Sequence, residues 1–245
     1  MKYAIISDIH GNDYALKKIL EDIESRNIQK IINLGDSVSG PFNPQNVISL
    51  LQNKEIICVK GNHERQLLGE FKNMGKTDQY SYKLLTKDQL KGLDSWKSYF
   101  SDGEILCFHG TPYIDNKYLI YTVTKNGVRD ATDDEIINRL GEYYNQYNVF
   151  ICGHTHIPKI RKIAGNKQII DVGSVGLPAY RDNVPFEHKM ESKSNCARYT
   201  IIEKNNESWI TNQIKVKYNY QRAAKEAKNR GRSDFANSIL SGKVL

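Results

Sequence analysis

The sequence has no long hydrophobic run and no closely spaced pair of cysteines. Because a membrane-spanning helix needs about 18 or more consecutive apolar residues, we expect no transmembrane segment among the 245 residues. The first residues enter a strand pattern directly, without the apolar region of a signal peptide, so we expect a cytoplasmic protein with no membrane partner. The four cysteines form no C-x-x-C pair, which argues against a zinc knuckle or a redox motif.

Histidine is also scarce, and its placement is informative. The sequence has six histidines, and all but His188 follow an apolar run within a few residues of a glycine. Scattered structural histidines would not be distributed in this way. The five that share this placement are His10, His63, His109, His154 and His156.

The charge balance is basic and leaves the kind of partner open. The formal charge is 35 − 28 = +7, in a composition of 39% hydrophobic and 26% charged residues that is ordinary for a globular domain. Nucleic acid or an anionic substrate is compatible with this charge, although a solvated basic surface is the commoner cause. Lysines and arginines cluster between Lys215 and Arg232, which fits an exposed helix face or an anion-binding patch.

The first two thirds of the chain alternate between strand and helix patterns. This alternation predicts an α/β domain with a largely parallel sheet, in which ligands bind beyond the carboxyl ends of the strands. Apolar runs predict strands at residues 3–6, 30–34, 55–59, 104–108 and 149–152. Helical spacing and capping residues predict helices at residues 13–26, 45–52, 86–100 and 132–147.

The pattern changes after Pro158, where alternating β-rich runs predict antiparallel strands. We expect one domain over residues 1–245, in which residues 65–130 form a helical and loop insert bordering the site and residues 219–245 a helical tail. The expected strands cover residues 159–164, 167–172, 197–203 and 208–216, with a turn at residues 205–206. Residues 182–194 are expected to be polar and mobile.

Polar side chains that can bind metals follow the predicted strands. Asp8 and His10 stand two residues apart, so both side chains can face one point, although this pair alone could equally cap a strand. Later strands end in the same way, with Asp36, Asn62, His63, His109, His154 and His156. The set combines carboxylates, imidazoles and an amide without a thiolate, which suits two divalent ions. We expect Mn²⁺ first, with Fe, Ni²⁺, Zn²⁺ or Mg²⁺ as alternatives. Two ions about 3.5–4 Å apart can clamp a phosphoryl group and activate water.

Five blocks at these positions together resemble the calcineurin-like metallophosphoesterase superfamily, in particular its small bacterial and archaeal phosphodiesterase-like branch. The blocks occur in the family's order and cover residues 1 to about 180. They are Asp8-x-His10, Gly35-Asp36, Gly61-Asn62-His63-Glu64, His109-Gly110 and Gly153-His154-Thr155-His156. The resemblance implies a four-layer α/β/β/α sandwich with mixed sheets and an active site at the carboxyl ends of the strands.

The resemblance also implies a role for each site residue. His63 would contact the phosphate and act as the general acid, positioned by Asp36, and Asn12 would touch the phosphate. One ion would be held by Asp8, His10 and His156, the other by Asn62, His109 and His154, and Asp36 would bridge them.

The sequence departs from part of the superfamily at the position of an arginine that grips the phosphate. Its phosphoprotein phosphatases carry Asp-Arg-Gly after the bridging aspartate, but no arginine follows Asp36 here. Arg181 could replace that contact, or could simply be a solvated side chain.

The expected function is therefore a two-metal hydrolase that uses metal-activated water on phosphodiester or phosphoanhydride bonds of a small nucleotide-type substrate. Dinucleoside polyphosphates and cyclic nucleotides are candidates, and a homo-oligomer is compatible with the sequence. The alternatives are a phosphomonoesterase or protein phosphatase, a nuclease that uses the basic surface, and a catalytically silent scaffold on the same fold. A silent scaffold would have lost metal ligands or His63, whereas this chain keeps all eight strand-end residues.

Overall fold

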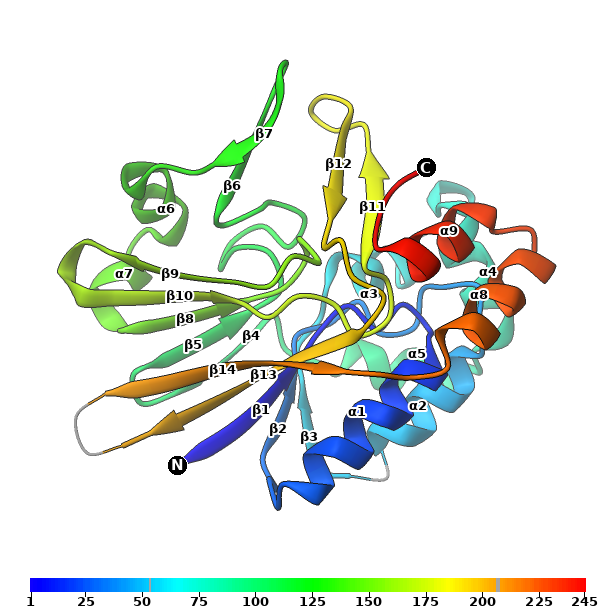
Figure 1. The fold of residues 1–245 in the computed structure, drawn as a ribbon, viewed down its shortest axis with the longest axis horizontal. Helices are drawn as coiled ribbons and strands as arrows, with labels where there is room; N and C mark the ends of the chain where they lie inside the picture. The colour runs from blue at the N-terminus through cyan, green and yellow to red at the C-terminus, as the bar shows by residue number, and fades with distance from the viewer. Residues whose placement is uncertain (53, 206–207) are drawn as a thin grey trace.

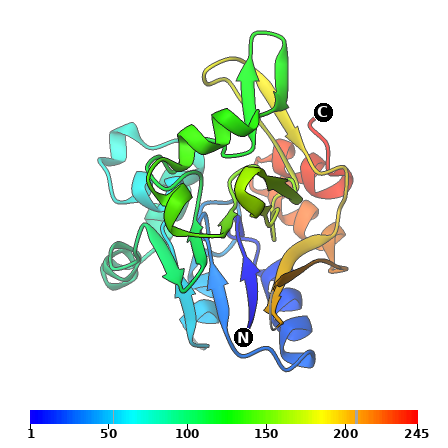
Figure 2. The same ribbon diagram turned by 90° about the vertical axis from the view of Figure 1, so that its left-hand side faces the viewer.

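The computed structural model describes residues 1–52, 54–205 and 208–245. In the described part of the chain, two five-stranded sheets are stacked between layers of helices (Figures 1 and 2). The first sheet has the order β14-β13-β1-β2-β3, and β1, β2 and β3 run parallel to one another. Its strands are β1 (Lys2–Ile6), β2 (Ile31–Asn33), β3 (Ile56–Cys58), β13 (Ala197–Lys204) and β14 (Trp209–Val216).

The second sheet has the order β4-β5-β8-β10-β9. The inner strands β5, β8 and β10 are parallel, and antiparallel strands form both edges. Each sheet is therefore mixed, with its parallel strands ending at one edge. The strands are β4 (Tyr99–Asp102), β5 (Ile105–Phe108), β8 (Val149–Cys152), β9 (Lys159–Ile163) and β10 (Lys167–Asp171).

Helices cover the outer faces of both sheets, and two hairpins extend from the molecule on the same side in Figure 1. The hairpins are β6 (Tyr121–Thr124) with β7 (Gly127–Asp130) and β11 (Ala179–Asp182) with β12 (His188–Glu191). The helices are α1 (Asp13–Ser25), α2 (Pro44–Gln52), α3 (Asn62–Leu67), α4 (Lys76–Leu84), α5 (Lys87–Asp94), α6 (Asp133–Leu140), α7 (Tyr143–Gln146), α8 (Tyr220–Asn229) and α9 (Ser233–Ser241), with short 3₁₀ turns η1 (Phe71–Asn73) and η2 (Ala164–Asn166).

The side chains of β1 explain the layering. Successive side chains of a strand point to opposite faces. Ile5 belongs to the apolar cluster that includes Ile105 and Ile151 of the second sheet. Ile6 belongs instead to the cluster with Leu16 of α1. A third cluster joins the other face of the second sheet to α6. Three cores between four layers make the α/β/β/α sandwich that the sequence predicted.

Two predicted helices are shorter than expected. The helix predicted over residues 86–100 ends at Asp94, because the chain after it becomes the edge strand β4, which pairs with β5. Phe100, at the end of the range predicted as helix, is partly buried and packs against the core between the sheets. The helix predicted over residues 132–147 is divided into α6 and α7 at Gly141, whose φ of +54° is incompatible with a continuous helix.

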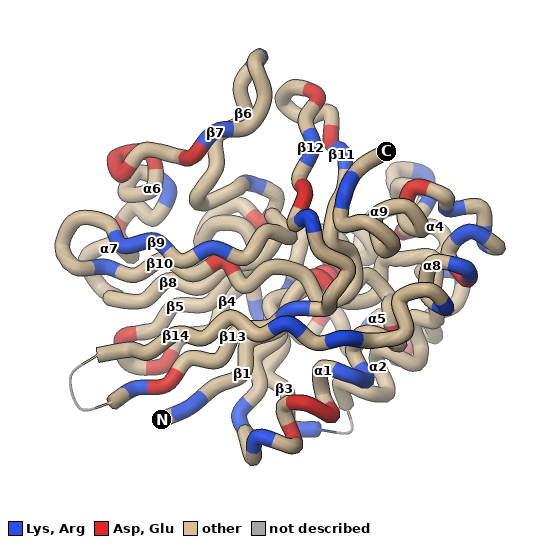
Figure 3. The backbone as a smooth tube through the Cα atoms, viewed as in Figure 1, with Lys and Arg blue, Asp and Glu red and all other residues tan. Residues whose placement is uncertain are grey.

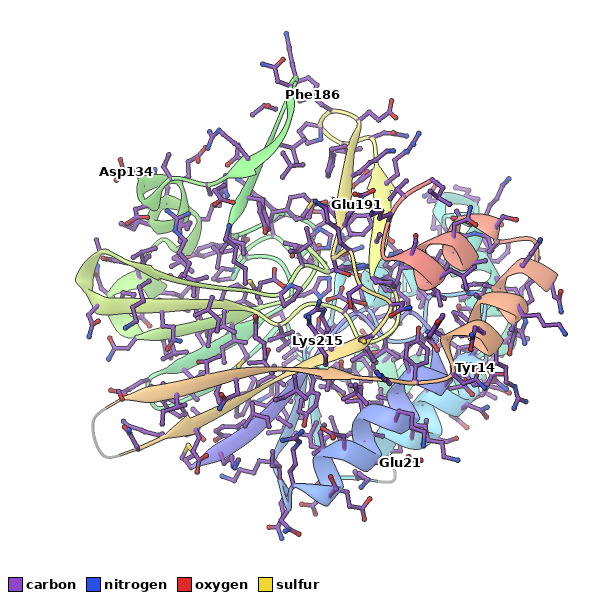
Figure 4. All side chains as sticks on the ribbon, in the orientation of Figure 1. Tyr14, Glu21, Asp134, Phe186, Glu191 and Lys215 are labelled. Atoms are coloured by element: carbon purple, nitrogen blue, oxygen red, sulfur yellow. The ribbon has the colours of Figure 1, made fainter. Side chains whose placement is uncertain are left out.

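The segments without a sequence motif also contain regular structure. Residues 182–194, which were expected to be polar and mobile, contain β12, and this strand pairs with β11. Figure 4 labels Phe186 and Glu191 near the two ends of β12. The range 65–130 contributes β4 and β5 to the second sheet as well as helices. The expected turn at residues 205–206 includes residue 206, which lies outside the described residues. Among the described helices, none is long and apolar enough to cross a membrane.

Candidate metal centre

The fold brings the predicted metal-binding residues together at the carboxyl ends of the parallel strands. Asp8 and His10 follow β1, Asp36 follows β2, and Asn62 begins α3 directly after β3. In the second sheet, His109 follows β5, and the loop after β8 carries the other two histidines. All seven predicted ligands are buried: Asp8, His10, Asp36, Asn62, His109, His154 and His156.

Five of these residues share an unusual backbone conformation. Their φ angles lie between +49° and +67°, in the left-handed region that residues other than glycine rarely occupy. Such a conformation persists only where the surrounding structure holds it, and it is concentrated at functional sites. The five residues are Asp8, His10, Asp36, His154 and His156.

Asp8, His10 and His156 form one potential metal site. The Nε2 atoms of the two histidines lie 3.1 Å apart. Oδ1 of Asp8 lies 3.3 Å from Nε2 of His156 and 4.0 Å from Nε2 of His10. Two nitrogens that each lie about 2.1 Å from one ion at a right angle are separated by about 3 Å. The spacing of these three side chains therefore fits ligands that share an ion.

Asp36, His109 and His154 form a second such site beside the first. Nε2 of His109 lies 3.2 Å from Oδ2 of Asp36 and 3.9 Å from Oδ1 of Asp8, so the two sites are adjacent. The two clusters are consistent with a binuclear centre for divalent ions.

Buried atoms without partners indicate what the centre is suited to bind. Oδ1 of Asp8, Oδ1 of Asn62 and Nε2 of His109 are buried and have no hydrogen-bond partner among the described residues. Buried polar atoms are normally paired, so groups left unpaired need an explanation such as an ion. All three atoms are potential ligand atoms, and the residues present fit the binding of divalent metals.

Backbone carbonyls fix the histidine tautomers. Nδ1 of His10 donates to the Ser39 carbonyl at 3.0 Å, and Nδ1 of His109 donates to the Leu34 carbonyl at 2.9 Å. In both rings Nε2 is then the atom that can face a metal, and such an outer partner also orients the ring. Burial, together with the neighbouring His156, lowers the pKa of His10 to about 3. A neutral imidazole is the form that binds metal.

His63 stands beside the clusters, and a residue that the sequence analysis did not consider holds its ring. Nδ1 of His63 lies 2.7 Å from Oδ1 of Asp78, a buried carboxylate of α4 that also accepts from the Ser39 hydroxyl at 2.6 Å. Asp36 was expected to position His63, but its Oδ1 accepts from the backbone N–H of His63 instead. Burial alone would lower the pKa of His63, and the carboxylates of Asp36 and Asp78 outweigh it and raise this pKa to about 9.

Glu64 holds the two loops that carry Asp36 and Asn62. Its buried carboxylate accepts hydrogen bonds from the backbone N–H groups of Asp36 and Ser37, each at 2.7 Å, and of Gly61 at 2.9 Å. Gly61 must be glycine, because a Cβ there would collide with the Asp36 carboxylate. Glu64 belongs to the Gly-Asn-His-Glu block, yet its residue type alone did not indicate this task.

Replacing Glu64 with alanine is expected to destabilise the protein. Three buried N–H groups would lose their acceptor, and each unpaired group costs about 1–3 kcal/mol, so relaxation should leave a loss of roughly 2–4 kcal/mol. Urea unfolding of the metal-free protein measures this loss. Glu21→Ala is the matched control, since Glu21 lies exposed on α1 (Figure 4). A Glu64→Ala protein as stable as that control would contradict the role assigned to the carboxylate.

The clusters open into a cleft with a volume of about 540 Å³. This volume falls within the range of about 300–1,000 Å³ that is usual for small-molecule sites. Residues of α4, β11 and α9 contribute to the lining, among them Thr77, Arg181, Arg232 and Phe235. No motif in the sequence placed the helical tail, which supplies α9, at the cleft. The ring of Phe235 packs edge-on against His10 at 6.4 Å between ring centroids, so the tail supports a predicted metal ligand directly.

The two predicted substrate contacts outside the motifs differ in their placement. Arg181 lies at the cleft with its side chain about half exposed, and it pairs with Glu187 at 3.1 Å. Asn12 is fully buried and does not line the cleft. Its side chain accepts from the Ala15 N–H at the start of α1 and donates to the Gly176 carbonyl. Both polar ends of the Asn12 side chain are thus engaged within the fold.

The basic cluster in the tail does not form a stripe along the cleft. Figure 3 shows lysines and arginines spread over several elements, among them β9, β14 and α8. Of the cluster between Lys215 and Arg232, only Arg232 lines the cleft in the described part of the chain. Its guanidinium is paired with Asp234 through contacts of 2.9 and 2.6 Å.

Comparison with known proteins identifies the family. A model of the calcineurin-like phosphoesterase superfamily domain matches residues 1–189, which include every candidate metal ligand described above. The chain belongs to the calcineurin-like phosphoesterase superfamily. The uncharacterized protein MJ0912 of Methanocaldococcus jannaschii is 27% identical to this phosphoesterase over an alignment of 248 residues. The alignment covers 93% of this chain and 92% of that protein.

Solved structures of the same architecture extend over the whole phosphoesterase. A metallophosphoesterase from Sphaerobacter thermophilus has a TM-score of 0.74 at 21% identity and covers 99% of this chain and 100% of its own. The hypothetical protein PH1004 from Pyrococcus horikoshii OT3 has a TM-score of 0.76 at 17% identity and covers 100% of this chain and 99% of its own. These structures confirm the fold.

Proposed function

We propose that this metallophosphoesterase hydrolyses phosphodiester or phosphoanhydride bonds of a small nucleotide-type substrate, with two divalent ions and Mn²⁺ as the first candidate. The observation that carries the proposal is the convergence of two carboxylate–imidazole clusters beside His63 in one cleft. Ligands of this kind also accept Fe, Ni²⁺, Zn²⁺ and Mg²⁺. A silent scaffold would have no need to keep the complete set of ligands and His63 together.

Each residue has a distinct task in the proposed mechanism. Bound ions would act as Lewis acids and lower the pKa of a water molecule to form the nucleophile. His63 donates a proton from Nε2 to the leaving oxygen, since Asp78 engages Nδ1 and leaves Nε2 for the substrate. The proposed ligands of one ion are Asp8, His10 and His156, those of the other are Asn62, His109 and His154, and Asp36 is shared.

The arginines at the cleft favour a diester over a monoester. A phosphomonoester carries more negative charge than a diester, and a free guanidinium is the group best suited to grip it. Among the described residues, Arg181 and Arg232 are the arginines that line the cleft, and each already pairs with a carboxylate. No arginine follows Asp36. Arg181 remains the proposed rim contact, which it would make by leaving Glu187.

A nuclease is less well supported than a hydrolase of small molecules. Binding of a nucleic-acid strand relies on several lysines and arginines that follow the phosphate backbone. Most of the basic residues in the tail lie away from the cleft. The two arginines that line the cleft, Arg181 and Arg232, are paired with Glu187 and Asp234. The substrate expected from this arrangement is a small phosphoester.

A substrate panel tests the proposal. The Mn²⁺-loaded protein is expected to hydrolyse bis-p-nitrophenyl phosphate with a higher kcat/KM than p-nitrophenyl phosphate, and to cleave at least one member of a panel of cyclic nucleotides and diadenosine polyphosphates. The measurement is product release under identical metal and pH conditions. A clear preference for the monoester would favour the phosphomonoesterase, and the absence of turnover on every compound would contradict the proposed hydrolase.

A further inference from the structure

A row of buried polar groups leads from the β11–β12 hairpin to the loop that carries His154 and His156. The hydroxyl of Tyr180 donates to the His154 carbonyl at 2.8 Å. The hydroxyl of Tyr118 lies 2.7 Å from that of Tyr180 and 2.8 Å from Nε2 of His188. None of these three residues belongs to a block that the sequence analysis singled out.

The direction of the hydrogen bonds follows from counting protons. A carbonyl can only accept, so Tyr180 uses its proton on the His154 carbonyl. The contact between the two hydroxyl oxygens then needs the proton of Tyr118. On the other side of Tyr118, Nε2 of His188 lies 2.8 Å from its hydroxyl, and Nδ1 of His188 lies 2.7 Å from the Phe186 carbonyl. The row of contacts therefore runs from His188 through both tyrosines to the loop after β8.

This loop needs external support because its backbone is unusual. His154 and His156 both have positive φ angles, of 67° and 61°. The N–H of His154 donates to Oδ2 of Asp8 at 3.0 Å, and its carbonyl accepts from Tyr180 at 2.8 Å. The backbone N–H and the carbonyl of His154 are therefore both held from outside the loop, the N–H by the proposed metal ligand Asp8 and the carbonyl by Tyr180.

Ring contacts add to the same support. The ring of Tyr180 packs against His156 at 4.5 Å between centroids, and the ring of Tyr118 packs against His154 at 5.1 Å. Each tyrosine thus limits the rotation of one histidine, while their hydroxyls connect the two contacts. The histidines belong to different metal clusters, so a shift of this loop would disturb both.

We propose that Tyr180, supported by Tyr118 and His188, is a positioning residue that keeps His154 and His156 in their metal-binding arrangement. The proposal rests on the proposed metal centre, because the task of Tyr180 is defined toward the ions. Tyr180 acts through the histidines and has no chemical task of its own. Removal of an outer partner of a metal ligand typically lowers metal affinity by about 10–100-fold.

Tyr180→Phe tests the proposal, since it removes the hydroxyl and keeps the ring. We expect the Mn²⁺ affinity of the metal-free variant, measured by isothermal titration calorimetry, to fall by about 10-fold or more. The Mn²⁺ concentration that gives half-maximal hydrolysis of bis-p-nitrophenyl phosphate should rise in parallel. Tyr118→Phe should weaken Mn²⁺ binding in the same direction, and the double variant should lose less than the two single losses combined, because the two hydroxyls act in one chain.

Tyr144→Phe is the matched control. Its hydroxyl also donates to a backbone carbonyl, that of Ala164 at 2.9 Å, but this contact joins α7 to η2, outside the cleft. Its Mn²⁺ affinity should equal that of the unaltered protein. Unchanged Mn²⁺ affinity in both folded Tyr180→Phe and Tyr118→Phe would overturn the positioning role while leaving the metal centre intact. If the unaltered protein bound no Mn²⁺ or other divalent ion in the same titration, the proposed function itself would fail, and the positioning role with it.

Discussion

Replacement of His63 by asparagine is expected to lower turnover by about 10²–10⁴-fold while both metal ions stay bound. His63 belongs to neither metal cluster, so its loss should spare the ligands. Its ring lines the cleft and is held through Nδ1 by Asp78, which suits a group that donates a proton from Nε2. Asparagine can occupy a similar position but cannot protonate a leaving oxygen. The measurements are kcat on a diester substrate and the metal content of the purified variant.

The leaving group makes this experiment sharper. A diester whose leaving group is an alkoxide depends on a proton donor, whereas p-nitrophenolate can depart without one. The loss in His63→Asn should therefore be larger for the alkyl ester than for bis-p-nitrophenyl phosphate. Equal losses on both substrates would argue for a binding role only. Turnover at the level of the unaltered enzyme on both would remove His63 from the mechanism.

Replacement of Asp36 by alanine has a different expected result, in which metal and activity disappear together. The Asp36 carboxylate lies next to His109 in the second cluster, and we propose that it contacts both ions. Without it both sites lose a charged ligand. The same change leaves the backbone N–H of His63 without its acceptor. We expect fewer than two ions per chain after gel filtration, measured by mass spectrometry of the metals, and no detectable diester hydrolysis.

Asp134→Ala provides the control for the loss of an aspartate. Asp134 lies on α6, well outside the cleft (Figure 4), and this variant should retain two ions and full activity. Two tightly bound ions per chain in Asp36→Ala would rule out the bridging assignment. Bound metal without turnover would instead restrict Asp36 to a role in the reaction.

The fold and the ligand set could be predicted because their signals are local. A short apolar run predicts a strand, and a polar residue just after the run is placed at the strand end whatever the rest of the chain does. Parallel strands of one sheet end at the same edge, so Asp8 and Asp36 become neighbours once β1 pairs with β2. The same logic places His109 beside His154, because β5 pairs with β8.

The errors in the secondary structure have a different cause. Residues 86–100 have a helical pattern of apolar positions, and local propensity favours one helix. Phe100 instead packs against the core between the sheets when the chain turns after Asp94 and pairs with β5. In residues 182–194 the polar composition hid a strand that is stabilised by pairing with β11. Tertiary contacts outweigh local preference in both segments.

The sequence by itself determined the family, the layered fold and which side chains are the candidate metal ligands, since each depends on residue type and position relative to a strand. Only the tertiary structure decided which groups orient them. Asp78 reaches His63 because α4 packs beside α3, and Tyr180 reaches the His154 carbonyl from β11. Such contacts join segments far apart in the chain, and no spacing or periodicity in the sequence encodes them.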